Sequence, residues 1–124
     1  KFKCEAGQEL VIGGFTAPRG SRTEFGALLL GYHDGAALRY AGKVGTGFDT
    51  ETLQAIGSRL RRLTVATPPF ADPGSIRERF VTWVKPELVA QVGFSEWTGA
   101  GRLRHPRFLG LRDDKPASKV VRES

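Results

Sequence analysis

The stretch "RHPRFLGLRDDKP", Arg104 to Pro116, gathers the groups of this sequence that are best suited to holding phosphate. Arg112, Asp114 and Lys115 form an R-x-D-K pattern directly after the apolar run 108–111. Arginine and lysine donate charge-assisted hydrogen bonds to phosphate oxygens, and an adjacent carboxylate can hold one of the cations in position. The alternative is a solvated basic surface that ends a strand, and the charge pattern alone favours that alternative.

A second segment with possible phosphate chemistry is "GKVGTGF", residues 42–48. Glycines flanking Lys43 and Thr46 would let the backbone lie close to a phosphate chain, with Lys43 as the point charge. The same glycines could instead shape a barrel corner before a helix. The segment is not a Walker-type loop, because its lysine and glycines come in the wrong order. Both interpretations stay open on the sequence.

Conventional catalytic sets are absent from the sequence. The two histidines, His33 and His105, and the single cysteine, Cys4, give no metal-binding spacing, so no metal site is predicted. No serine lies in a nucleophile-elbow context. The lone cysteine excludes an internal disulfide and is typical of a reducing, cytosolic setting.

Charge points to a polyanionic partner, most simply nucleic acid. The 124 residues suffice for one domain, with a net charge of +6 and a pI near 10.0. Residues 99–124 carry seven Lys/Arg against three Asp/Glu, so the excess gathers near the end, where a solvated basic tail is the alternative. No apolar run approaches the ~20 residues of a membrane span.

Hydrophobic patterning predicts the elements that must position these residues. Strands are expected over 8–16, 25–34 and 37–48, with a bend at Gly13-Gly14 and a hairpin turn at Asp34-Gly35. The period then becomes helical over 49–63, with Asp49 as N-cap. The apolar stripe of this helix comprises Leu53, Ile56, Leu60 and Leu63, and its solvated face Arg59, Arg61 and Arg62.

A proline-rich connector, 66–75, precedes two further strands, predicted over 83–98 and 102–111. Pro86 indicates a sheet edge near the start of the first, and Pro106 is expected to break the second. The order β-β-β-α-β-β predicts a mainly β protein. It matches an OB-fold, a five-stranded Greek-key barrel with one helix between strands 3 and 4. This fold often binds oligonucleotides, but a fold alone does not assign a function.

The sequence resembles the C-terminal OB domain of ATP-dependent DNA ligases, particularly the ligase module of the multidomain bacterial end-joining ligases. The residues that carry the resemblance are "KFKC", "ELVIGGFT", "GALLLGYHDG", "RYAGKVGTGF", "WVKPELVAQVGFSEWT" and "RLRHPRFLGLRDDKP". The last of these matches motif VI of the family, and Lys1 and Lys3 match the K-x-K of motif V. The resemblance implies that 1–7 end motif V and link to a missing adenylation domain, that 8–115 form the OB domain, and that 116–124 form a basic tail.

In such ligases a lysine of the upstream domain attacks the α-phosphate of ATP, and the adenylate then passes to a DNA 5′-phosphate before the nick is sealed. The resemblance implies that Arg112 and Lys115 contact the β- and γ-phosphates and orient the leaving pyrophosphate, with Asp114 orienting those cations. Other nucleotide contacts are assigned to Arg104 and Arg107, weaker candidates for the same task, and to Lys1 and Lys3, at the α-phosphate.

The resemblance also implies a second face that clamps duplex DNA. Its candidate backbone contacts are Lys43, Thr46, Arg19 and Arg22. The implied partners are double-stranded DNA with nicks or ends and the upstream adenylation domain of the same polypeptide, without a membrane. ATP and Mg²⁺ would serve the full enzyme, with neither bound tightly to this chain. The implied location is the bacterial cytoplasm, at the nucleoid.

The chain departs from the family in one respect, because the nucleophilic motif K-x-D-G-x-R and motifs III and IV occur nowhere in it. We therefore expect it to be one part of a ligase, inactive by itself.

The alternative is a free-standing OB protein that binds single-stranded nucleic acid through exposed aromatic side chains. Core packing is the expected role of Phe15, Phe25, Tyr32, Trp83, Phe94 and Trp97. The OB domain of an mRNA-capping guanylyltransferase is a third possibility. The segment "GKVGTGF" favours a ligase over this possibility.

Overall fold

The computed structural model describes residues 6–18, 25–76, 80–114 and 116–121. Nine strands, one α-helix and two short 3-10 helices are found within these ranges. In chain order they are β1 (Ala6–Thr16), β2 (Leu28–Asp34), β3 (Ala37–Val44), α1 (Thr50–Arg62), β4 (Thr64–Val65), η1 (Pro73–Ser75), β5 (Val81–Val84), β6 (Val89–Phe94), β7 (Glu96–Trp97), β8 (Leu103–Arg104), β9 (Arg107–Arg112) and η2 (Ala117–Lys119).

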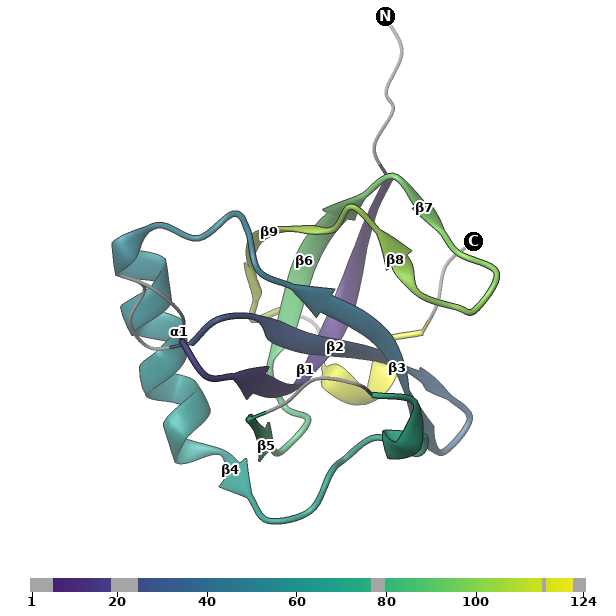
Figure 1. Ribbon diagram of the computed structural model, residues 1–124, viewed down its shortest axis with the longest axis horizontal. Helices are drawn as coiled ribbons and strands as arrows, with labels where there is room; N and C mark the ends of the chain where they lie inside the picture. Colours follow the sequence, from purple (N-terminus) through teal and green to yellow (C-terminus); the bar gives the residue numbers. More distant parts are fainter. Residues whose placement is uncertain (1–5, 19–24, 77–79, 115, 122–124) are drawn as a thin grey trace, which may run out of the picture.

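Strand β1 is the centre of the sheet, because it pairs with three other strands (Figure 1). One edge pairs with β2, whereas the other pairs first with β6, as far as Val11, and then with β5, from Gly14 onward. The change of partner falls at Gly13, where a β-carbon would lie 2.5 Å from the ring of Phe70. Glycine leaves room for that ring, and the register with β2 shifts between Ile12 and Gly14, so the predicted bend at Gly13-Gly14 is confirmed.

The barrel closes where the segment after β3 meets β9. The amide of Phe108 donates to the carbonyl of Thr46 at 2.9 Å. Gly47 lies in this contact with φ +97, and a β-carbon there would be 2.3 Å from the Phe108 carbonyl oxygen. The glycines of "GKVGTGF" therefore do shape a barrel corner. The strands pair antiparallel, and α1 lies between β3 and β5 in the chain, so the predicted OB-fold is confirmed.

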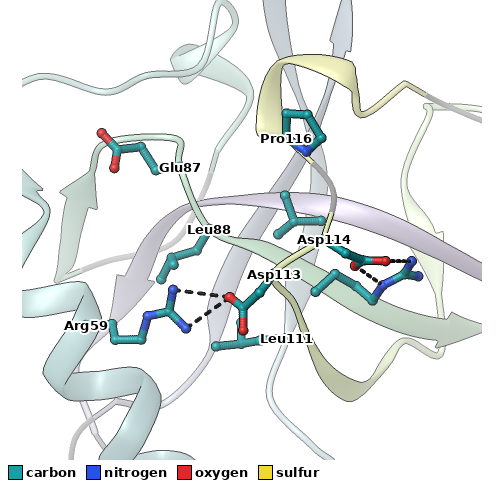
Figure 2. A pocket seen from close by; sticks show the side chains of 9 residues that line it. Arg59, Glu87, Leu88, Leu111, Asp113, Asp114 and Pro116 are labelled. Atoms are coloured by element: carbon teal, nitrogen blue, oxygen red, sulfur yellow. Dashed lines mark hydrogen bonds and ion pairs between the residues drawn. The ribbon is translucent and has the colours of Figure 1, made fainter.

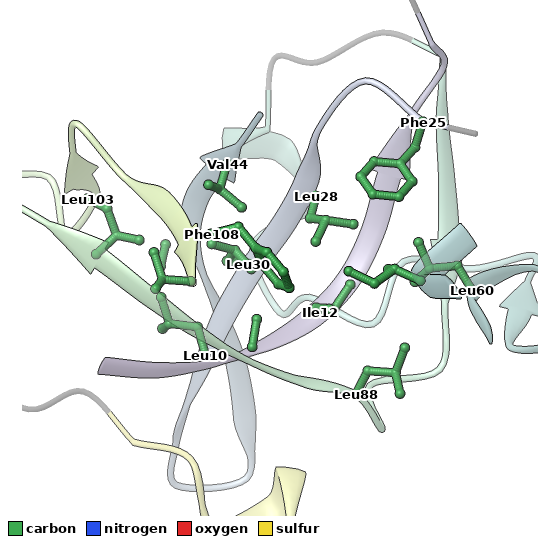
Figure 3. Close-up of a cluster of buried hydrophobic side chains, with 14 of the residues drawn as sticks. Leu10, Ile12, Phe25, Leu28, Leu30, Val44, Leu60, Leu88, Leu103 and Phe108 are labelled. Atoms are coloured by element: carbon green, nitrogen blue, oxygen red, sulfur yellow. The ribbon is translucent and has the colours of Figure 1, made fainter. Parts of the chain in front are cut away.

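Buried side chains from both halves of the chain fill the barrel (Figure 3). Leu10 and Ile12 of β1 meet Leu28 and Leu30 of β2, and Phe108 of β9 packs into the same cluster. All five are at most 4% exposed. Burying this apolar surface is the main force that holds β9, and with it the R-x-D-K stretch, onto the barrel.

Helix α1 covers one side of the barrel, and the β7–β8 hairpin lies on the opposite side in Figure 1. The predicted apolar stripe is confirmed, because Leu53, Ile56 and Leu60 are buried. The predicted cap is confirmed as well, since Asp49 Oδ1 accepts from the amide of Thr52 at 2.7 Å. A side-chain acceptor at this position satisfies an amide that the helix itself leaves unpaired.

The N-cap gives the first testable prediction. The hydrogen bonds from Thr52 hold the pKa of Asp49 below its usual range. A lowered folded-state pKa stabilises the fold above the unfolded-state pKa near 4, and this contribution is lost as the pH falls through the lower folded-state pKa. We expect Asp49→Ala to lower the melting temperature by a few degrees at pH 7 and by less at pH 2, measured by circular dichroism. A deficit that stays equal at both pH values would contradict the charged cap.

The last two predicted strands, 83–98 and 102–111, are broken in the structure. The first is divided between β5 and β6, because Pro86 has no amide to pair and Glu87 donates instead to the carbonyl of Lys85 at 2.8 Å in a turn. It is divided again at Ser95, between β6 and β7. The second is divided into β8 and β9 at His105, whose φ is +54, just before Pro106. The predicted break at Pro106 is therefore confirmed, whereas periodicity did not reveal the interruptions of the first strand, since its apolar residues continue across them.

The segment predicted as a basic tail, 116–124, is attached to the barrel over its described part. Val120 is 1% exposed, and its carbonyl accepts from the amide of His33 at 2.8 Å. The buried Gln8 donates from Nε2 to the carbonyl of Val121 at 2.9 Å. The chain is therefore fixed on both sides of the R-x-D-K stretch, by β9 before it and by Val120 after it.

Candidate functional site

Arg112 is the last residue of β9, and its guanidinium is held by three acceptor side chains. Nη1 donates to Glu9 Oε2 and to Gln91 Oε1, each at 2.8 Å. Nε and Nη2 donate to the two oxygens of Asp114 at 3.0 and 3.1 Å. This last pair is the fork-to-fork arrangement that arginine makes with carboxylates and phosphates. Arg112 and Asp114 of the predicted site are thus brought together.

The two sides of this guanidinium differ in their exposure to solvent. The Glu9 side chain is 18% exposed, whereas that of Asp114 is 71% exposed, and Arg112 lies between them at 35%. The hydrogen bonds that Arg112 donates to Asp114, the charge of Asp114 and the charge of Glu9 together raise the pKa of Arg112 above its ordinary value. Arg112 is therefore a permanent cation whose Nε–Nη2 edge faces the more exposed side.

Next to Arg112, Asp113 joins the motif to helix α1. Both terminal nitrogens of Arg59 lie 3.3 Å from Asp113 Oδ1, as the dashed lines in Figure 2 show. Both side chains are exposed, at 43% and 75%, so this pair adds little to stability. The solvated helix face predicted for Arg59 is confirmed by this exposure. The turn after β9 brings the Asp113 carboxylate to that face.

A depression of about 420 Å³ opens between α1, the start of β6 and the end of β9 (Figure 2). Its lining residues include Arg59, Leu88, Leu111, Arg112 and Asp114. The apolar floor and the charged rim combine hydrophobic contact with groups that recognise phosphate. Within the described residues no group of three His, Cys, Asp or Glu side chains could hold a metal ion.

The other predicted contact residues gather at the opposite end of β9, about 15 Å from Arg112 along the strand. Thr46 Oγ1 donates to the carbonyl of Pro106 at 3.4 Å, which puts the exposed Thr46 beside Arg107. Arg104 pairs with Glu96 at 3.0 Å. The exposed Lys43 lies on β3, which contacts β8. The structure therefore does not group Arg104 and Arg107 with Arg112.

Five of the predicted site residues lie outside the described residues. They are Lys1, Lys3, Arg19, Arg22 and Lys115. Their proposed contacts therefore stay predictions.

The sequence interpretation missed Glu9 and Gln91, the two residues that hold Nη1 of Arg112. Glu9 follows Gln8 at the start of the apolar run in "QELVI", and Gln91 is the one polar residue in "VAQVGF". That anomaly is a usable signal, because a polar residue in a mostly buried strand needs a partner. The signal does not identify Arg112 as the partner, because Arg112 is 103 residues away from Glu9 in the chain and 21 residues away from Gln91.

The aromatic residues that could have formed a stacking surface for bases pack inward. Phe25 and Phe94 are buried, and Phe15, Tyr32 and Trp97 pack against the same core. Trp83 packs against the second cluster of buried residues. In the part of the chain that the structure describes, Phe80 is the one aromatic side chain that is largely exposed, at 80%. These positions favour the core-packing role predicted for the six aromatics.

No helix within the described ranges is both long enough and apolar enough to cross a bilayer.

Comparison with known proteins gives consistent matches. Residues 21–115 match the family model described as the ATP dependent DNA ligase C terminal region. The multifunctional non-homologous end joining protein LigD of Pseudomonas aeruginosa is 44% identical over 127 residues, which cover 99% of this chain and 15% of that protein. The chain thus spans a small part of that relative's length.

Two solved structures share the fold. The crystal structure of the ligase domain from M. tuberculosis LigD superposes with a TM-score of 0.86 at 42% identity, covering 98% of this chain and 40% of that one. A mycobacterial DNA ligase D complexed with ATP and MES gives a TM-score of 0.80 at 40% identity, covering 95% of this chain and 38% of that one.

Proposed function

The chain belongs to the family of ATP-dependent DNA ligase C-terminal regions, and from this premise we propose that it acts as the OB domain of a longer ligase that seals duplex DNA in end-joining repair. The observation that carries the proposal is the charged fork of Arg112, in an R-x-D-K motif at the end of the matched region 21–115. The relative from Pseudomonas aeruginosa is a non-homologous end joining protein, which supports the repair role.

In the first step of ligation, the chain would orient the phosphates of ATP. Arg112 and Lys115 would contact the β- and γ-phosphates and align the leaving pyrophosphate, with Asp114 orienting Arg112. Such a step depends mainly on positioning and on electrostatic stabilisation. The fork of Arg112 fits this role, because a phosphate presents the same pair of oxygens as the Asp114 carboxylate. A mycobacterial DNA ligase D that shares this fold over part of its length was solved in complex with ATP, which supports the use of ATP by the longer ligase.

Other parts of the machinery would come from outside this chain. The motif K-x-D-G-x-R is absent from the sequence, so the attacking lysine would belong to an upstream adenylation domain of the same polypeptide. Lys1 and Lys3 would contact the α-phosphate at the junction of the two domains. Mg²⁺ would arrive on the ATP phosphates. The ligase would work in the bacterial cytoplasm, at the nucleoid.

A second face of the domain would contact duplex DNA during sealing. Lys43 and Thr46 are exposed near the closing corner of the barrel, and Arg19 and Arg22 are further candidates from the sequence. The position of Arg107 beside Thr46, and of Arg104 nearby, supports a DNA contact for these two arginines in place of a nucleotide contact. Contacts of this kind bind the phosphate backbone without reading the bases.

The DNA role is tested by the substrate preference and salt dependence of binding. We expect the ligase that carries this chain to prefer nicked duplex to single strands, and Lys43→Ala to weaken duplex binding about threefold to tenfold. The magnitude of the negative slope of log association constant against log salt concentration should decrease by about one, because one phosphate contact is lost. Both quantities come from fluorescence anisotropy over a salt series.

Lys85→Ala is the matched control, since it removes one exposed positive charge outside the proposed contacts. We expect it to change the affinity less than Lys43→Ala does. A clear preference for single strands would instead support the free-standing single-strand binding protein.

A further inference from the structure

We propose that Glu9 and Gln91 are positioning residues for Arg112, which hold Nη1 against the sheet so that the Nε–Nη2 edge is presented to the phosphates of the nucleotide. The inference rests on the proposed function and adds two residues to its ATP-binding step. Both side-chain oxygens lie 2.8 Å from the same nitrogen. Neither residue belongs to the R-x-D-K motif.

Sheet register places the three residues side by side. Glu9 of β1 and Gln91 of β6 are directly opposite each other, so both side chains emerge on the same face of the sheet. Arg112 of β9 is opposite Val89, which is two residues from Gln91 and therefore on that face too. The support of Nη1 is thus built into three neighbouring strands. A strand-borne site is held more precisely than one carried by loops.

The opposite edge of the guanidinium has a partner that can be exchanged. Asp114 lies beyond the end of β9 and its side chain is 71% exposed, compared with 18% for Glu9. A phosphate can take the place of the Asp114 carboxylate with the same fork geometry and without moving Arg112. Asp114 therefore orients Arg112 until the nucleotide arrives, and Glu9 and Gln91 hold it before and after.

This arrangement lowers the entropic cost of contact with the nucleotide. A free arginine side chain loses several rotatable bonds when it binds a phosphate, whereas Arg112 is already ordered by its contacts in the sheet. Without Glu9 or Gln91, the guanidinium would sample other positions. The loss should fall on adenylation by ATP and not on sealing of DNA that is already adenylated, because only the first step uses the β- and γ-phosphates.

The test uses the full-length ligase polypeptide that carries this chain. Self-adenylation is measured over a range of ATP concentrations, and sealing is measured on pre-adenylated nicked duplex. We expect Glu9→Ala and Gln91→Ala each to lower kcat/KM for adenylation about tenfold, with little change in sealing. Glu9→Gln keeps an oxygen acceptor for Nη1 and should retain most of the activity. Asp34→Ala is the matched control. It also removes a carboxylate that pairs with an arginine, since Asp34 Oδ2 lies 3.7 Å from Arg39 Nε, but both side chains are exposed and neither belongs to the proposed site.

A double-mutant cycle separates positioning from a general structural role. In an Arg112→Ala background, Glu9→Ala should cause no further loss of adenylation, because it acts through Arg112. A second tenfold loss in that background would overturn the positioning role, and so would unchanged adenylation in both Glu9→Ala and Gln91→Ala. Adenylation that is unaffected by Arg112→Ala itself would overturn the proposed ATP-binding function. Thermal melting of each variant checks folding, and Gln91→Ala carries the test if Glu9→Ala does not fold.

Discussion

Replacing Arg112 with alanine is expected to slow self-adenylation of the ligase about a hundredfold, which is the lower end of the loss seen when one charge-stabilising donor is removed from a transition state. The physical reason is that the fork of Nε and Nη2 would no longer align the β- and γ-phosphates with the direction in which pyrophosphate leaves. Sealing of pre-adenylated nicked DNA should change much less. The measurement is the single-turnover rate of each step.

Arg112→Lys sharpens this prediction, because lysine keeps the positive charge but cannot make two parallel hydrogen bonds. We expect the lysine variant to adenylate itself faster than the alanine variant and more slowly than the unchanged ligase. Lys115→Ala should show the same selectivity for the first step. Equal losses in adenylation and sealing would show that the motif does not act selectively at the ATP step.

Replacing Gly47 with alanine is expected to destabilise the domain by about 3 kcal/mol. Two costs add at this position. The φ of +97 is one that side-chain-bearing residues rarely adopt, and the new β-carbon would lie 2.3 Å from the carbonyl oxygen of Phe108. Relief of that overlap would separate β9 from the segment after β3 and open the barrel. The melting temperature should fall by about 10 °C.

Gly99→Ala is the matched control for this prediction. A β-carbon at Gly99 would meet nothing within 4 Å, so its substitution should change the melting temperature little. Urea denaturation of both variants gives the free energies of unfolding. A Gly47 variant as stable as the control would show that β9 does not need the close approach at Thr46 and Phe108.

These two predictions differ in what the sequence reveals about them. The R-x-D-K pattern made Arg112 a candidate phosphate contact by residue type and by resemblance to the family, before any fold was known. In contrast, "GKVGTGF" left two interpretations open, since glycines suit both a phosphate-binding loop and a tight corner. The hydrogen bond between Thr46 and Phe108, residues 62 positions apart, shows that Gly47 serves the corner.

The boundaries of the helices and strands also divide into those that local sequence predicts and those that depend on distant contacts. The helix over 50–62 and its cap at Asp49 were predictable, because helical periodicity and capping are local properties of the chain. The break at Pro106 was predictable too, because a proline interrupts strand pairing by its residue type alone. The turn at Pro86 was not found, since apolar residues continue on both sides of it. The burial of Val120 was also missed, because its partners on β1 and β2 are far away in the sequence.

The sequence by itself therefore determined the order of the elements and the apolar core, because residue type and local spacing encode both. It also made Arg112 the candidate cation for phosphate, through the resemblance to the family. Only the tertiary structure decided what surrounds that cation. Glu9, Gln91 and Arg112 meet because antiparallel register aligns β1, β6 and β9, and Arg104 and Arg107 lie apart from Arg112 because β9 extends between them. Register depends on contacts summed over whole strands, which no short stretch of sequence contains.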